Sequence, residues 1–320
     1  MDAGPCGRYR RFYKWFAANL VFWAALALPL GVSSQAVPGW VQISDPRVPN
    51  GGVLVLTAEP PIGAGIDVEV VGKFSGDTFK FIPLIEPGAG PKKVALVGIS
   101  YFQKAGTYEV EVEARVKAVA GISTGPLRQT LKFEVFELGY RTEKLSVDPK
   151  KLRPTKKDLR RINAEKNEIG RLYRDRKELE TFDAKFVLPI ESAVTSPYGT
   201  KRTFNGLMQS FHQGLDLKAK DGTPVVTAAG GIVVMAKDLY FTGNTILVDH
   251  GYGIVTVYAH ISKLDAPVGT TVQAGQRIGL SGSTGRVSGP HLHWGAVIRG
   301  VKVDPGLLPL KPSVQASSKP

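Results

Sequence analysis

The sequence predicts a mainly β protein in which two β domains flank one helix. Residues 37–138 and 186–308 contain short runs of alternating apolar and polar residues, separated by Gly, Pro, Asn and Asp. This pattern is typical of strands joined by turns. Between them, in residues 139–185, apolar residues recur at helical spacing instead. A length of 320 residues is ordinary for two domains.

Residues 1–36 are predicted to be a secretory signal peptide. Basic residues in 8–14 precede an apolar stretch at 16–32, and Ser34-Gln35-Ala36 supplies small residues at both cleavage-specificity positions. An uncleaved membrane anchor is the alternative, although the apolar stretch is near the lower length limit for a span. We expect cleavage after Ala36 and export to the periplasm or cell envelope. The single cysteine, Cys6, precedes the cleavage position, so the mature chain would form no disulfide.

Residues 37–138 predict an antiparallel β-sandwich. The segments 67–71 and 107–113 alternate with period two, and turn residues such as those of 87–91 separate the runs. The piece at 105–108, which leads into an alternating strand, resembles a late strand of immunoglobulin-like domains. This domain contains no histidine and no metal-binding pattern, so we assign it no catalytic role.

Residues 139–185 form a basic linker with a predicted amphipathic helix over about 156–180. Thr155 followed by Asp158 is the signature of a helix N-cap with an acid in the first turn. Five apolar residues then fall near one helical face: Leu159, Ile162, Ile169, Leu172 and Tyr173. The stretch from Lys150 to Arg161 holds seven basic residues and one acid, which we interpret as a solvated surface rather than a nucleic-acid site.

The formal net charge of +13 allows two interpretations. One is a solubilising surface, and the other is a polyanionic partner such as nucleic acid, an acidic cell wall or a membrane surface. The secretory signal argues against nucleic acid, so acidic envelope polymers remain as the candidate polyanion. We expect contact with a membrane only through the signal segment, if that segment stays uncleaved.

All five histidines lie between His212 and His293, and three of them fall in two short patterns. These are His212-Gln213-Gly214-Leu215-Asp216 and His291-Leu292-His293. A catalytic zinc ion takes three imidazole or carboxylate ligands and one water. The two patterns offer at most four such groups, which is enough for one catalytic site. With only one cysteine, a cysteine-rich structural zinc site is excluded.

Strand geometry suggests how these groups meet. Side chains two apart on a strand share a face, so His291 and His293 can point into one cleft. His212 and Asp216 are four apart, and an extended or slightly bulged segment would bring them to one face. Gly214 makes a helix unfavourable there.

A hairpin is predicted from residues 245–248 and 254–260, joined by the turn 249–253. His260 ends its second strand, and strict alternation gives it Tyr258 and Thr256 as same-face neighbours. Three separate strands could therefore converge on one metal ion and one base. His250 lies in the glycine-flanked turn, and a structural hydrogen bond explains it.

Residues from about 189 to 305 resemble the lysostaphin-type (LytM-domain) zinc endopeptidases, which cut peptidoglycan cross-links. The matching pieces are Phe211-His212-Gln213-Gly214-Leu215-Asp216, Gly222-Thr223-Pro224-Val225, Gly243-Asn244-Thr245-Ile246, Asp249-His250-Gly251, Tyr258-Ala259-His260, Gly282-Ser283-Thr284-Gly285 and Gly289-Pro290-His291-Leu292-His293-Trp294. The ordered series is far more specific than either metal pattern alone. The resemblance implies an all-β domain similar to the duplicated hybrid motif over residues 186–308.

The resemblance also implies a role for each site residue. His212, Asp216 and His293 would bind one zinc ion per chain. His260 and His291 would flank the zinc-bound water and act as the catalytic residues. None of the five positions departs from the family pattern, whereas some relatives have lost ligands and only activate cell-wall amidases.

The implied function is that of an exported zinc-dependent endopeptidase, which hydrolyses peptide cross-links of bacterial peptidoglycan through a zinc-activated water. The cross-link is either a D-alanyl–diaminopimelyl or a glycine-rich one, and the sequence leaves both open. The main alternative is a non-hydrolytic LytM-type activator of amidases or a wall-binding module, and a structural zinc site is a third. The intact ligand set argues against both. The tail 309–320, rich in Pro, Ser, Lys and Ala, is predicted to be disordered.

Overall fold

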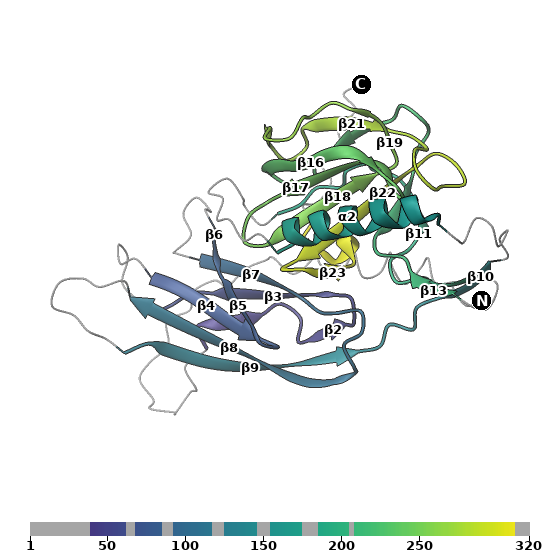
Figure 1. The fold of residues 1–320 in the computed structure, drawn as a ribbon. Helices are drawn as coiled ribbons and strands as arrows, with labels where there is room; N and C mark the ends of the chain where they lie inside the picture. Colours follow the sequence, from purple (N-terminus) through teal and green to yellow (C-terminus); the bar gives the residue numbers. More distant parts are fainter. Residues whose placement is uncertain are drawn as a thin grey trace, which may run out of the picture. The chain divides into compact units, whose positions relative to one another are not determined.

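The computed structural model describes residues 39–61, 68–84, 92–116, 125–145, 154–174, 185–204 and 208–310. The predicted signal peptide lies outside these ranges, as does the predicted disordered tail from residue 311 on. The prediction of disorder is wrong for Pro309 and Leu310, because the Phe186 N–H bonds to the Pro309 carbonyl and Leu310 forms a β-bridge with Phe186. Residues Gly39–Lys311 form one compact unit. Within the described ranges, no helix is both long and apolar enough to cross a bilayer. The prediction of a mainly β protein is confirmed (Figure 1).

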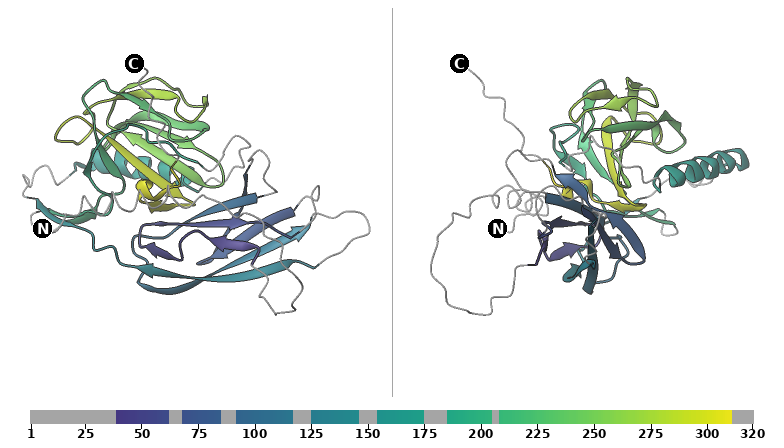
Figure 2. Two further views of the ribbon diagram at one scale, coloured as in Figure 1. Left: turned by 180° about the vertical axis from the view of Figure 1, so that it is seen from behind. Right: turned by 90° about the vertical axis from the view of Figure 1, so that its left-hand side faces the viewer.

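Two sheets make up the N-terminal two-sheet region, residues 39–138. The first has the strand order β1 (Val41–Ile43), β3 (Val53–Ala58), β7 (Lys92–Gly98) and β6 (Ile82–Leu84). The second has the order β2 (Arg47–Pro49), β9 (Leu127–Phe136), β8 (Gly106–Val116), β4 (Val68–Phe74) and β5 (Asp77–Lys80). Apolar residues from both sheets share one core, to which Leu56 and Val110 belong. Figure 2 shows the long β8–β9 hairpin from behind.

The first of these sheets is buried on both faces. Leu54 and Ala95 belong to the core between the two sheets. Val53 and Leu96, on the same strands, instead join the core of the C-terminal region. A strand that is buried on both faces has a continuous apolar sequence rather than an alternating one, which explains the unbroken run 53–56.

The predicted helix is α2, Lys156–Leu172 (Figure 1). It begins where the sequence predicts, because Thr155 accepts a hydrogen bond from the Asp158 backbone N–H while the Asp158 carboxylate accepts one from the Thr155 N–H. The helix ends at Leu172, with Tyr173 as its C-cap, so the predicted end near residue 180 is wrong. Ile169, Leu172 and Tyr173 pack against the C-terminal sheet, whereas Leu159 is exposed.

Three sheets make up the C-terminal region. The eight-stranded sheet has the order β11 (Val194–Ser196), β14 (Leu215–Lys218), β22 (His291–Ile298), β18 (Ile254–Ala259), β17 (Gly243–Asp249), β16 (Gly231–Leu239) and β20 (Thr271–Val272), with β23 (Val301–Val303) paired to β22. The other two consist of β15 (Pro224–Val226), β21 (Arg277–Ser281) and β19 (Ile261–Leu264), and of β10 (Thr142–Leu145), β12 (Lys201–Phe204) and β13 (Met208–Phe211). A short 3₁₀ helix, η2 (Pro305–Leu307), follows β23.

Alternation along β22 separates the two faces of the eight-stranded sheet. Leu292 and Trp294 point into the main core of the C-terminal region. Val297 lies on the opposite face, in a smaller cluster that α2 covers. His291 and His293 are on the face of Val297 by the same alternation, so the candidate site lies beside the part of the sheet that α2 covers.

The predicted linker and the two-sheet region both contribute to the C-terminal region. Strand β10, within the linker 139–185, pairs in parallel with β12. Tyr101, which follows β7, stacks on Phe211 with ring centroids 4.1 Å apart and planes 9° apart. The Tyr101 hydroxyl also donates a hydrogen bond to the Gly199 carbonyl. Segments distant in sequence therefore support the strand that leads into His212.

Candidate metal centre

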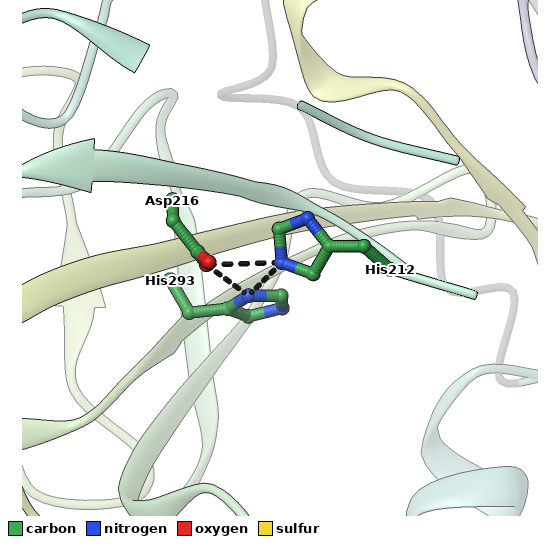
Figure 3. Close-up of side chains that lie close together, drawn as sticks. All are labelled: His212, Asp216 and His293. Atoms are coloured by element: carbon green, nitrogen blue, oxygen red, sulfur yellow. Dashed lines mark hydrogen bonds and ion pairs between the residues drawn. The ribbon is translucent and has the colours of Figure 1, made fainter. Parts of the chain in front are cut away.

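Three side chains with metal-binding atoms meet at the edge of the eight-stranded sheet (Figure 3). His212 follows β13, Asp216 lies in β14, and His293 lies in β22 directly opposite Asp216. Asp216 Oδ1 is 2.9 Å from both His212 Nε2 and His293 Nδ1, and those two nitrogens are 3.0 Å apart. The structure thus brings together the three residues that the sequence analysis assigned to the metal.

The donor set fits a zinc ion. Bonds of 2.0–2.2 Å in tetrahedral geometry place neighbouring ligand atoms about 3.3 Å apart, close to the separations observed. His212 Nδ1 is 3.0 Å from the Pro197 carbonyl oxygen, so that nitrogen carries the proton of the neutral ring. Nε2 then presents a lone pair to the Asp216 carboxylate, an arrangement that a cation between them would stabilise.

Burial and charge shape the ionisation of these groups. Burial alone would raise the pKa of Asp216, but the close approach of the His212 and His293 ring nitrogens to its carboxylate outweighs burial and holds that pKa well below its usual range. Burial lowers the pKa of His293, against the opposing effect of Asp216. Asp216 is therefore a carboxylate and His293 favours its neutral ring, the forms in which these side chains bind metals.

His260 and His291 lie beside the three donors. Their ring centroids are 4.8 Å apart, and the His260 ring is 6.0 Å from that of His293. His291 Nε2 is 3.6 Å from Asp216 Oδ1, while its Nδ1 is 2.9 Å from the Gly289 carbonyl oxygen. The structure therefore gathers all five predicted site residues.

His260 reaches this cluster through an unusual backbone conformation. By register, Ala259 pairs with His293 and Tyr258 pairs with Trp294, so strict alternation would direct His260 into the core with Tyr258. His260 instead has φ of 64°, in the left-handed region that side chains rarely adopt. The strand alternation that the sequence analysis assumed here is wrong, because this turn moves the ring to the face of His293.

The loop at Gly282–Gly285 orients His260. His260 Nδ1 is 2.9 Å from the Thr284 carbonyl oxygen, which fixes the proton on Nδ1 and leaves Nε2 unprotonated. Thr284 is itself held, because its hydroxyl donates to the Ile261 carbonyl and accepts from the Asn244 N–H. Burial lowers the pKa of His260 to about 4.

The link between His212 and Asp216 also differs from the prediction. The two residues do not share one extended segment, since β13 ends at Phe211 and β14 begins at Leu215. Gly214 lies in the bend, where an added Cβ would be 2.8 Å from atoms of the His293 ring. The bend, rather than strand alternation, brings both donors to one point.

His250 lies outside the cluster, as predicted. It is fully buried. Its Nδ1 is 2.7 Å from the Gly230 carbonyl oxygen, and its Nε2 is 2.7 Å from the Thr256 hydroxyl. Burial lowers its pKa to about 4. The prediction of a structural hydrogen bond is confirmed.

Sequence reasoning missed the groups that orient the histidines. The carbonyls of Pro197, Thr284 and Gly289 each face a histidine Nδ1. Backbone carbonyls leave no trace in the residue types, although Gly282-Ser283-Thr284-Gly285 was already among the matching motifs.

Residues 210–305 match the family model of peptidase family M23. Over 93 residues the chain is 46% identical to peptidoglycan DD-endopeptidase ShyA of Vibrio cholerae, and this match covers 29% of this chain and 22% of that protein. Over 118 residues it is 36% identical to DD-carboxypeptidase/endopeptidase Mpg of Neisseria meningitidis, and this match covers 36% of this chain and 27% of that protein. The chain thus spans about a quarter of the length of these curated relatives.

A crystal structure of a putative peptidase M23 from Pseudomonas aeruginosa is similar over a longer range. It is 27% identical with a TM-score of 0.59, and the match covers 81% of this chain and 94% of that one. A match of that extent includes part of the N-terminal two-sheet region as well as the C-terminal region. Residues 210–305, which contain the five site residues, thus form a peptidase M23 domain.

Proposed function

We propose that this protein is an exported zinc-dependent endopeptidase that hydrolyses peptide cross-links of bacterial peptidoglycan. The observation that carries the proposal is the meeting of His212, Asp216 and His293 within about 3 Å of one another, with His260 and His291 beside them. The names of the Vibrio and Neisseria relatives support the reaction and the substrate class.

His212, Asp216 and His293 would hold the zinc ion. A zinc ion in such a site acidifies a bound water and polarises a carbonyl group. The protein's own contribution is to fix the three donors, two on strands β14 and β22 and one directly after β13, with the His212 ring oriented by Pro197. Three protein ligands leave a position open, which is the arrangement of catalytic rather than structural zinc sites.

His260 and His291 would move the protons. Both rings have Nδ1 facing a backbone carbonyl, so each presents an unprotonated Nε2 to the site. One such nitrogen can accept the proton of the attacking water, and the resulting imidazolium can stabilise the oxyanion or protonate the leaving amine. No described glutamate belongs to the donor group, so we assign general acid–base catalysis to the two histidines.

The decisive experiment is digestion of purified sacculi by the full-length protein. We expect new muropeptides with a freed amine and carboxylate at the cross-link, loss of this activity with a chelator, and recovery on adding zinc. The His293→Ala variant is the matched negative control. Binding to sacculi without any change in muropeptides, by zinc-loaded protein, would instead favour a non-hydrolytic activator or wall-binding module.

Export can be tested separately. The basic, apolar and small-residue zones of residues 1–36 motivate this part of the proposal. Mass spectrometry of the protein from the cell envelope should find a chain that starts at Val37. A chain that starts at Met1 would favour an uncleaved anchor.

A further inference from the structure

Lys218 lies on the same face of the sheet as the candidate metal centre. It is directly opposite His291 in the β14–β22 register, as Asp216 is opposite His293, and directly paired residues of antiparallel strands share a face with their Cβ atoms about 5 Å apart. Lys218 is exposed. Within the described part of the chain it forms no ion pair, so its charge is available to a ligand at the site.

A second cation, Arg286, lies in the loop between Gly282 and His291. Its loop is closed at the base by a hydrogen bond from the His291 N–H to the Gly282 carbonyl. Its guanidinium carbon lies 5.3 Å from the centroid of the Phe241 ring, and its backbone N–H bonds to the Phe241 carbonyl. Among the described residues no carboxylate pairs with Arg286. The side chain is therefore held by an aromatic face rather than neutralised.

The Arg286–Phe241 pair is built into the same backbone that orients His260. Thr242, next to Phe241, accepts a hydrogen bond from the His260 N–H. Thr284, two residues before Arg286, accepts one from His260 Nδ1. Lys218 lies on β14, on one side of β22, and the Arg286 loop contacts the His260 side. The strand of Lys218 and the loop of Arg286 therefore lie on opposite sides of β22.

We propose that Lys218 and Arg286 are specificity-determining residues that bind carboxylates of an acidic cross-link peptide next to the scissile bond. This inference rests on the proposed function and names its substrate class. A diaminopimelyl cross-link carries a carboxylate on the carbon that bears the scissile nitrogen, whereas a glycine bridge is uncharged there. Two unpaired cations beside the site favour the first kind, because arginine and lysine are the usual partners of carboxylates.

The test compares two cross-linked muropeptide dimers, one with that carboxylate free and one with it as a carboxamide. We measure kcat/KM for both with the full-length protein, with Lys218→Met, with Arg286→Gln and with the double variant. Lys263→Met and Arg277→Gln are matched controls, because both of these residues form ion pairs with Asp265. Zinc content and thermal midpoint are recorded for every variant.

We expect the wild-type protein to prefer the free carboxylate by about tenfold, the scale of one charged hydrogen bond. Each single variant should reduce this preference to about threefold, and the double variant should abolish it, with zinc content unchanged. The preference should also shrink as salt rises. The two control variants should keep the full preference.

Equal cleavage of both dimers by the wild-type protein would overturn the inference while leaving the proposed hydrolysis intact. A full preference retained in the double variant would overturn it too. If the variants lose only binding to sacculi and keep the preference, the cations serve an acidic envelope polymer and the inference is wrong. Failure of the zinc-loaded wild-type protein to cut either dimer would overturn the proposed function and this inference with it.

Discussion

His250 and His260 belong to the same hairpin, yet their side chains lie in different surroundings. Both are nearly or fully buried, both have Nδ1 facing a backbone carbonyl, and burial lowers the pKa of both to about 4. They differ at Nε2. That of His250 meets the Thr256 hydroxyl inside the core, whereas the His260 ring lies against His291 and His293. What faces the second nitrogen, rather than burial or pKa, separates a structural histidine from a candidate catalytic one.

The largest effect is expected from His293→Ala, because this change removes one of three converging donors. Bound zinc should fall well below one ion per chain, and the rate of hydrolysis should fall by more than about a hundredfold. This loss is larger than the one expected when a residue that only hydrogen-bonds to a metal ligand is changed. Elemental analysis and muropeptide release measure the two results. His250→Ala serves as control and should keep its zinc when folded. Full zinc occupancy in His293→Ala would show that His293 is not a ligand.

The next largest effect is expected from His260→Ala and His291→Ala, each tested alone. Loss of a positioned acid–base group costs on the order of a hundredfold or more in rate. Both variants should retain most of the zinc, since neither ring belongs to the three-donor group. Near-normal turnover in either variant would show that the substituted histidine is not catalytic and, in this respect, does not differ from His250.

A third prediction uses the pKa of His250. The folded protein keeps this ring neutral down to about pH 4, whereas the unfolded chain protonates it near pH 6.5. The contribution of His250 to the free energy of unfolding is therefore fully present above pH 6.5. It is lost as the pH falls from 6.5 towards 4, by about 3 kcal/mol. In urea unfolding across this pH range, the free energy of unfolding should fall less steeply with decreasing pH for His250→Gln than for the wild-type protein. Identical pH dependences would contradict the low pKa of His250.

The smallest effect is expected from Thr284→Val, which removes the hydroxyl that anchors the loop to Ile261 and Asn244. The Thr284 carbonyl would then hold the His260 ring less firmly, and kcat should fall about fivefold with zinc unchanged, as small losses of alignment do. Ser262→Ala removes a hydroxyl bonded to the Ser281 carbonyl in the neighbouring sheet and should leave kcat unaltered. Equal losses in the two variants would mean a general effect on stability.

The sequence was enough to predict which five side chains lie together and that His291 and His293 share a face, because motif order and strand period are properties of the sequence itself. It was not enough for His260, whose place depends on a left-handed residue. It also failed at the bend that joins His212 to Asp216, where Gly214 is needed because His293 and the Trp294 carbonyl approach from another strand. Such constraints come from residues that are distant in sequence, so no local sequence pattern predicts them.

The position of Lys218 relative to the site could not be predicted from the sequence either. Alternation places Lys218 on the face of Asp216, but only the pairing of β14 with β22 sets it opposite His291. The course of the predicted linker was likewise beyond sequence reasoning. The parallel pairing of β10 with β12 joins segments more than fifty residues apart, and periodicity says nothing about which strands become neighbours.

The stacking of Tyr101 on Phe211 has a consequence for protein engineering. The two aromatic rings, and the apolar residues Val53 and Leu96 near them, belong to one continuous core with Trp294. A truncated or chimeric form of the protein that is cut within the linker would expose this apolar surface to water, which costs free energy and promotes aggregation. Chemical denaturation of the intact protein should accordingly show a single cooperative transition. A grafted replacement for the N-terminal sheets would have to supply its own partner for Phe211.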